Sequence, residues 1–206
     1  MLKYLNIHPE NPQVRFIQQS VQVLREGGVI LYPTDSGYAL GCHLDDKEAV
    51  DRIRRIRQLD KHHHFTLMCR DLKELGSYAR ADNTAFRLLK AYTPGPVTFI
   101  LNATKEVPRR LQHPKRKTIG LRIPDCVVTQ ALLSALGEPL MSVSFLLPEW
   151  DELSVPFDMQ EVCTQFEYQI DLILDSGFLK FEPTTIVDLT GKIPQVIRQG
   201  NKEIVL

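Results

Sequence analysis

Basic residues are absent from one long interval of the sequence, between Arg122 and Lys180. The 206 residues carry 25 lysines and arginines against 25 aspartates and glutamates, so the formal net charge is zero. The interval without basic residues holds acidic ones from Asp125 to Asp175, and the positive charge lies in the rest of the chain. Such a chain presents a cationic face to phosphate-bearing partners unless folding interleaves the two sets of charges.

Cysteine is scarce, and the usual spacing of a zinc or redox site is missing. The chain has 4 cysteines, which are widely spaced and include no CxxC pair. Each lies in or beside an apolar segment, so we expect buried, reduced thiols. The adjacent histidines 62–64 point alternately if the loop is extended and rarely chelate together. No metal site is therefore expected, although one of these histidines can contact a substrate.

Long apolar runs are also missing, and so are the features of a secretory signal. No stretch is long enough to span a bilayer, so no membrane partner is expected. The first eight residues lack a charged start, an apolar middle and a small-residue cleavage site, which predicts a cytoplasmic protein. A length of 206 residues favours a single domain over residues 1–206.

No Walker-type lysine and no GxGxxG loop occurs, but the stretch 27–41 is organised like a binding loop. The apolar run 29–32 follows two glycines and predicts a buried strand, which Pro33 should end because it has no N–H to donate. Thr34, Asp35, Ser36 and Tyr38 then surround Gly37. Small polar groups and exposed amides in such a loop suit an anion or a small polar ligand, or form an ordinary turn.

Helical and strand periodicities alternate along the chain, which predicts an α/β fold. We expect a single-domain, open, twisted mixed sheet with helices packed against it. The predicted helices cover 14–26, 45–58, 72–78, 84–92, part of 105–117, 127–136 and 159–166. The predicted strands cover 29–32, 38–44, 65–69, 97–102, 118–124, 140–145, 171–175, 185–189 and 195–198, the last two forming a hairpin.

Hydroxyl and guanidinium side chains recur at the ends of these strands, beside proline or glycine. Such groups, with few carboxylates among them, suit a negatively charged ligand. Arg122 and Arg198 lie among apolar residues, so each needs an anionic or multi-acceptor partner if it points inward. That partner is either a ligand or an internal carboxylate, for which Asp35, Asp125 and Asp188 are the candidates.

Two clusters of basic residues, 52–61 and 105–117, form the clearest concentrations of positive charge. Either cluster can bind along the phosphate backbone of a nucleic acid, or it can be an ordinary solvent-exposed surface. The residues that would bind RNA in the second cluster are Arg109, Arg110, Lys115, Arg116 and Lys117.

Five short motifs resemble those of the YrdC-like family, in the same order. Residues 32–41 (YPTDSGYALG) resemble its opening PTETxYGLG, and 94–98 (PGPVT) its PGPLT. Residues 118–125 (TIGLRIPD) are similar to its TVxVRxPD, 183–188 (PTTIVD) to its PSTVVD, and 197–200 (IRQG) to its closing R-x-G. The resemblance extends from about residue 14 to residue 200, which is nearly the whole chain.

The resemblance implies an open α/β fold with a large concave cationic groove. It also implies the joining of ATP, L-threonine and bicarbonate into threonylcarbamoyl-AMP with release of pyrophosphate, for tRNA modification. ATP would enter as its Mg²⁺ complex, and no tightly bound cofactor is expected. Family members have also been described as binding double-stranded RNA or tRNA, so an RNA-binding protein without catalysis is the alternative.

The same resemblance assigns roles to individual residues. Threonine would contact Thr34, Ser36, His64, Arg122 and Thr184. The nucleotide would contact Arg57, Thr118, Ser142 and Arg198. The positions closest to the chemistry would be Arg57, Lys61 and Ser144.

The sequence departs from the family pattern at two of these places. Residues 57–59 are Arg-Gln-Leu where the family usually has Lys-x-Arg, and 142–144 are Ser-Val-Ser where it has Ser-x-Asn. Arg57 can still neutralise a phosphate, but with a planar fork in place of a compact ammonium, and Leu59 removes a charge. The sequence therefore predicts a nucleotide-binding protein with weak or altered synthase activity.

Overall fold

The computed structural model describes residues 2–60, 63–146 and 158–206, and it is built on one sheet of 11 strands. Strand order across the sheet is β1-β9-β2-β3-β8-β4-β7-β6-β10-β11, with β5 paired to β6. The strands are β1 (Lys3–Asn6), β2 (Ile30–Thr34), β3 (Gly37–His43), β4 (Thr66–Met68), β5 (Ala79–Arg80), β6 (Val97–Ala103), β7 (Thr118–Arg122), β8 (Leu140–Ser144), β9 (Leu172–Asp175), β10 (Thr185–Asp188) and β11 (Gln195–Arg198).

Parallel and antiparallel pairs mix within the sheet, as the alternating sequence pattern predicts. β9 pairs in parallel with both of its neighbours, β1 and β2. The pairs β4–β7 and β6–β10 are also parallel. Hairpins join β2 to β3 and β10 to β11 in antiparallel fashion. The order ends in β1 on one side and β11 on the other, so the sheet is open and not closed into a barrel.

Helices pack on the sheet through their apolar sides. They are α1 (Val14–Arg25), α2 (Lys47–Arg57), α3 (Leu72–Tyr78), α4 (Asn83–Tyr92), α5 (Val127–Leu136) and α6 (Met159–Phe166). Asp46, Asp71 and Asp82 begin α2, α3 and α4 by accepting a hydrogen bond from the backbone N–H three residues on, which satisfies a free amide of the first turn. None of the helices in the described segments is long and apolar enough to cross a membrane.

The two faces of the sheet carry separate apolar clusters. One cluster joins the sheet to α2, α3, α4 and α6, and the other joins it to α1 and α5. The second cluster reaches Met68 of β4 and Leu140 of β8. Because strand side chains alternate between faces, residues in register with Met68 and its neighbours share that face. Thr66, Ser142 and Arg122 are on the same face of the sheet as Met68. We call the part of this face that carries them, next to the part packed against α5, the polar face.

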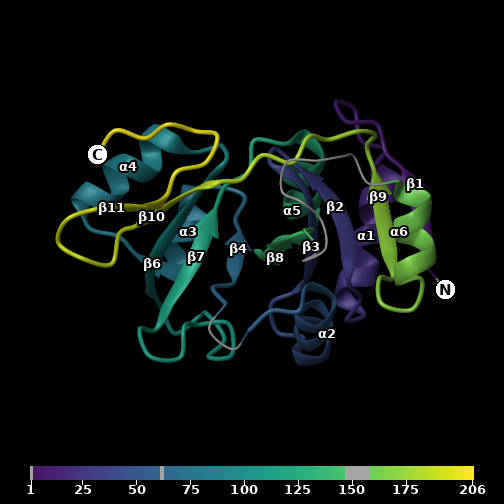
Figure 1. Cartoon of the computed structure of the whole chain (residues 1–206), viewed down its shortest axis with the longest axis horizontal. Coiled ribbons are helices and arrows are strands. Elements are labelled where there is room, and N and C mark those ends of the chain that lie inside the picture. The colour runs from purple at the N-terminus through teal and green to yellow at the C-terminus, as the bar shows by residue number, and fades with distance from the viewer. Residues whose placement is uncertain (1, 61–62, 147–157) are drawn as a thin grey trace.

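Figure 1 shows how the chain connects the two halves of the sheet. β1, β9 and β2 lie on the right with α1 and α6, whereas β6, β7, β10 and β11 lie on the left with α3 and α4. After β9 the chain crosses along the top of the view and enters β10 (Figure 1). This crossing brings the last part of the sequence to the strands that carry the polar face.

The predicted end of β2 at Pro33 is wrong, because the strand continues through Thr34. β9 pairs with β2 only at Ile30 and Leu31, so the missing N–H of Pro33 breaks no bond to β9. The carbonyl of Pro33 accepts hydrogen bonds from Thr129 Oγ1 at 2.6 Å and Cys126 Sγ at 3.6 Å. At this position β2 is therefore hydrogen-bonded to the first turn of α5 and to the residue that precedes it.

Two other local predictions also differ from the structure. No helix forms in 105–117, which is a succession of turns. β1 was not predicted at all, because three of its four residues are exposed and give no apolar pattern. The other predicted helices and strands are present, with ends that differ by a few residues, and the hairpin between β10 and β11 is confirmed.

Candidate functional site

The tight turn between β2 and β3 places Ser36 at the edge of the polar face. Thr34 Oγ1 accepts from the backbone N–H of Ser36 at 3.1 Å and donates to the carbonyl of Gly37 at 2.6 Å. Gly37 has a φ of +102°, which favours glycine, and a Cβ there would lie 3.3 Å from Phe181 Cα. The Thr34 side chain thus stabilises the turn through hydrogen bonds to the turn's own backbone.

Arg122, at the end of β7, is held by three neighbouring groups. Its Nη1 donates to Ser36 Oγ at 2.8 Å, its Nη2 to Asp35 Oδ1 at 2.5 Å, and its Nε to the Gly95 carbonyl at 3.4 Å. Burial lowers the pKa of Arg122, and Asp35 opposes that shift. Of the two partners considered from the sequence, an internal carboxylate is present, and it is Asp35.

Arg198 of β11 is held by a carbonyl and not by a carboxylate. Its Nε and Nη2 donate to the Thr184 carbonyl at 3.1 and 3.0 Å, and Nη2 also reaches Thr184 Oγ1 at 3.2 Å. Thr98 Oγ1 donates to Thr184 Oγ1 at 3.2 Å. These bonds fix Arg198 over the start of β10 and leave its positive charge without a carboxylate partner among the described residues.

The polar face is hollowed into a cavity of about 170 Å³. Most of the residues predicted for the site line it: Ser36, Arg57, His64, Arg122, Ser142, Ser144, Thr184 and Arg198. These residues come from the β2–β3 turn, α2, the loop before β4, β7, β8, the segment just before β10, and β11. The described lining residues include neither aspartate nor glutamate. A cavity with hydroxyl and guanidinium donors and without lining carboxylates suits an anionic ligand.

Two buried polar atoms of this lining have no hydrogen-bond partner in the described structure. They are Nε of Arg57, at the end of α2, and Nδ1 of His64. Burial lowers the pKa of both side chains, and for His64 the nearby His113 and Arg116 add to the effect. Buried polar groups are normally paired, so these two atoms mark where a ligand would supply the missing partners.

The remaining predicted residues lie elsewhere. Thr34, predicted to contact threonine, is not among the residues that line the cavity, and its hydroxyl bonds within the β2–β3 turn. Thr118 is buried with its Oγ1 unpaired, but it is not among the residues that line the cavity. Lys61 lies outside the described residues. The proposed RNA contacts Arg109, Arg110, Lys115, Arg116 and Lys117 are all exposed.

Sequence reasoning did not single out several lining residues, among them His63 and Phe181. Burial, with Arg57 nearby, lowers the pKa of His63 to about 4, so its imidazole is neutral at pH 7. His63 was treated only as one of three loop histidines, and Phe181 lies in the crossing segment, which has no periodic pattern. Thr98, which does line the cavity, belongs to the strand-end pattern of hydroxyls.

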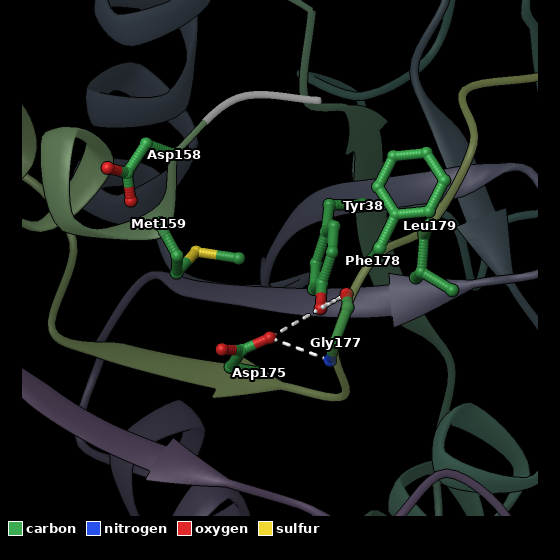
Figure 2. Close-up of a pocket in the computed structure, with 7 residues that line it drawn as sticks. All are labelled: Tyr38, Asp158, Met159, Asp175, Gly177, Phe178 and Leu179. Atoms are coloured by element: carbon green, nitrogen blue, oxygen red, sulfur yellow. Dashed lines mark hydrogen bonds between the residues drawn. The ribbon is translucent and has the colours of Figure 1, made fainter. Parts of the chain in front are cut away.

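A second cavity, of about 250 Å³, lies between α6 and the segment after β9 (Figure 2). Both carboxylate oxygens of Asp175 are already engaged there. Oδ1 accepts from Tyr38 Oη at 2.9 Å and from the Gly177 N–H at 2.8 Å, and Oδ2 accepts from Tyr4 Oη. The remaining lining is largely apolar, with Met159, Phe178 and Leu179 (Figure 2). This arrangement ties β9 to β1 and β3 and presents no unpaired donor or acceptor of Asp175 to a ligand.

The open mixed sheet and the cavity lined by hydroxyl and guanidinium groups on its polar face define an α/β protein with a cavity suited to an anionic ligand. Comparison with known families is consistent with this class. The chain belongs to the Sua5/YciO/YrdC family, whose description is telomere recombination and which matches residues 22–200. The resemblance to YrdC-like proteins is thereby confirmed.

Relatives are similar to this chain over nearly their whole length. The uncharacterised protein YciO of Escherichia coli strain K12 is 56% identical over 97% of this chain and 96% of its own. The crystal structure of E. coli YciO superposes with a TM-score of 0.92 at 55% identity and covers 98% of both chains. A threonylcarbamoyl-AMP synthase of Vibrio vulnificus is 30% identical over 89% of this chain and 98% of its own.

A more distant structure shares the fold. Sua5 of P. abyssi, solved in complex with L-threonine, has a TM-score of 0.83 and 24% sequence identity. It covers 97% of this chain and 57% of its own. The fold of the present chain therefore corresponds to one part of a longer protein in that case.

Proposed function

We propose that the protein binds ATP and L-threonine in the cavity on the polar face and has a weak or altered threonylcarbamoyl-AMP synthase activity. The observation that carries this proposal is the unpaired, buried Nε of Arg57 in a cavity without lining carboxylates. A buried guanidinium N–H that has no partner among the described residues is stabilised by an anion such as a phosphate. The name of the V. vulnificus relative supplies the reaction.

The reaction needs positioning and charge neutralisation more than a reactive side chain. The amine of threonine and bicarbonate condense to a carbamate with loss of water, and a carbamate oxygen attacks the α-phosphorus of ATP. The bond to the β-phosphate oxygen breaks, and pyrophosphate leaves with the electron pair. Hydroxyl and guanidinium donors offset the charge that accumulates, which lowers the barrier without a covalent intermediate on the protein.

The residues fall into two groups along the cavity. Ser36, His64, Arg122 and Thr184 would hold threonine, the amino acid bound in the P. abyssi structure. Arg57, Ser142 and Arg198 would hold the nucleotide, with Ser144 next to the reacting groups. Mg²⁺ would enter on the triphosphate oxygens, because the described lining offers hydroxyls and no carboxylate to bind it directly.

The departures from the family pattern explain why the activity is expected to be weak. Leu59 takes the place of a cation, and Ser144 takes the place of an asparagine amide. If each lost contact acts in the transition state, the rate falls by about a hundred- to a thousandfold per contact while binding persists.

The direct test incubates the protein with ATP, L-threonine, bicarbonate and Mg²⁺ and measures the adenylate by mass spectrometry, omitting each component in turn. Calorimetry on Arg57→Gln and Arg198→Ala should show ATP binding weaker by about ten- to a hundredfold, the effect of losing a charged hydrogen bond. Arg55→Gln, two residues away and exposed, is the charge-matched control. Absence of both adenylate and ATP binding would overturn the proposal.

A second candidate function is binding of double-stranded RNA or tRNA. It is favoured by the exposed run of Lys115, Arg116 and Lys117, which follows His113. The ring of His113 stacks on His64 at the cavity, with centroids 4.8 Å apart, so the basic run lies near the site. Replacing the three basic residues with glutamine should weaken RNA retention and flatten its salt dependence. Unchanged retention would count against RNA binding at this surface.

A further inference from the structure

Tyr32 lies behind the site, not in its lining, yet it contacts a residue that lines it. The side chain belongs to β2, is 0% exposed, and is not among the cavity residues. Its Oη lies 2.6 Å from Ser142 Oγ on β8, and Ser142 does line the cavity. A buried phenol is therefore in direct contact with a hydroxyl that faces the ligand.

This contact crosses an intervening strand. β3 lies between β2 and β8, and its Gly41 is in register with Ser142. A Cβ on Gly41 would lie 2.8 Å from Tyr32 Cε1 and 2.8 Å from Leu140 Cδ2, so the tyrosine ring occupies the space that glycine leaves. The absence of a side chain at Gly41 allows the phenol to reach Ser142.

The direction of the hydrogen bond follows from what each hydroxyl has around it. Burial raises the pKa of Tyr32, so the phenol keeps its proton. Among the hydrogen bonds of the described residues, Ser142 Oγ is the partner of Tyr32 Oη. If Ser142 donated, the phenolic hydrogen would be buried without an acceptor, which is costly. If Tyr32 donates, the phenolic hydrogen is paired, and the hydrogen of Ser142, a residue that lines the cavity, is free to point into it.

We propose that Tyr32 is a positioning residue, whose O–H donates to Ser142 Oγ and so directs the serine hydrogen into the cavity as a donor to an anionic ligand. Ser142 then acts toward the ligand as a donor. A donor in this position matches a phosphate oxygen, an assignment that rests on the proposed function. The orientation of the bond itself does not depend on it.

The binding test uses Tyr32→Phe, which removes the hydroxyl and keeps the ring over Gly41. ATP affinity, measured by calorimetry, should fall about tenfold, as it should in Ser142→Ala. The double variant should bind no more weakly than Ser142→Ala alone, because Tyr32 acts through Ser142. Tyr92→Phe, whose hydroxyl bonds to Val205 away from the cavity, should bind as the wild type does. Additive losses in the double variant would overturn the proposal.

A neutron crystal structure of the wild-type protein tests the orientation without any variant. The expected map places the deuteron of Tyr32 between the two oxygens and that of Ser142 toward the cavity. A Ser142 deuteron that points at Tyr32 would refute the inference, whether or not ATP binds. If ATP does not bind to the wild type, the proposed function fails, and the neutron map still decides the role of Tyr32.

Discussion

Arg122 and Asp35 form an ion pair inside the site, with Nη2 of the arginine donating to Oδ1 of the aspartate at 2.5 Å. Their side chains are 3% and 11% exposed. The second carboxylate oxygen, Oδ2, is buried without a partner. The charge of Arg122 is thus balanced from within the protein, whereas Arg57 forms no ion pair with a carboxylate in the described part of the chain.

Removing the carboxylate of this pair should destabilise the fold. Asp35→Ala leaves the Arg122 guanidinium buried without a counter-charge, and breaking a buried pair costs about 3–5 kcal/mol. Urea unfolding followed by circular dichroism measures the loss. Asp45→Ala is the control, because Asp45 is 70% exposed and 3.9 Å from Arg110, so its removal should cost under about 1 kcal/mol. Equal losses in the two variants would contradict a buried pair.

Gly200, just after β11, should tolerate no side chain. A Cβ there would lie 2.1 Å from the Pro183 carbonyl oxygen and 2.4 Å from the Thr184 carbonyl carbon, and backbone cannot move aside cheaply. Gly200→Ala should cost about 1–3 kcal/mol, as overpacking does, and loosen Arg198. Gly76→Ala in α3 meets nothing within 4 Å and should instead stabilise the protein by about 0.5–1 kcal/mol. Thermal unfolding of both variants checks the opposite signs.

Thr129 should stabilise the fold through its hydrogen bond to the Pro33 carbonyl. It is 0% exposed and donates to the Pro33 carbonyl, so Thr129→Val leaves that oxygen without its strongest partner at a cost of about 1–3 kcal/mol. Thr164→Val makes the same chemical change in α6, where the exposed hydroxyl bonds to Gln160. That variant should change the free energy of unfolding by less than about 0.5 kcal/mol. A similar cost at both positions would argue against a special role for the Pro33 contact.

Stability should fall as the pH is lowered from about 6.5 to about 4, in part because of His63. Its pKa is lowered from 6.5 to about 4 in the folded protein, by burial first and then by Arg57. Between these values the unfolded chain binds a proton that the folded chain does not, so stability rises with pH over this window. His63→Gln should flatten the dependence when urea unfolding is measured across it. His64 shifts in the same direction, so the double variant should flatten it further.

Much of the fold follows from the sequence because most elements bury one regular side. The α5 pattern 127–136 and the β11 pattern 195–198 were predicted with their exact ends. β1 was missed because it pairs with β9 at the sheet edge and is mostly exposed. Pro33 was misjudged because the extent of β9 beside β2 depends on tertiary pairing, which one strand's sequence does not reveal.

The residues that line the candidate site were predicted from strand ends and motifs. The same reasoning could not find Tyr32, which lies behind the lining and contacts it through Ser142. Ser36 precedes a glycine, and Arg122 and Ser142 are polar residues within otherwise apolar strand patterns, so the sequence alone indicates a binding role for them. Tyr32 looked like an ordinary core residue, because its link to Ser142 crosses β3 and joins positions 110 residues apart. Such a contact depends on strand order, which only the folded sheet specifies.

The cavity draws its lining from Ser36 near the start of the chain to Arg198 near its end. During synthesis the early strands, α2 and α5 leave the ribosome long before the crossing segment and the last hairpin do. A nascent chain can therefore bury most of its core while the ligand site is still incomplete. We therefore expect truncation before β11 to leave most of the sheet in place and to remove Arg198 from the lining of the cavity.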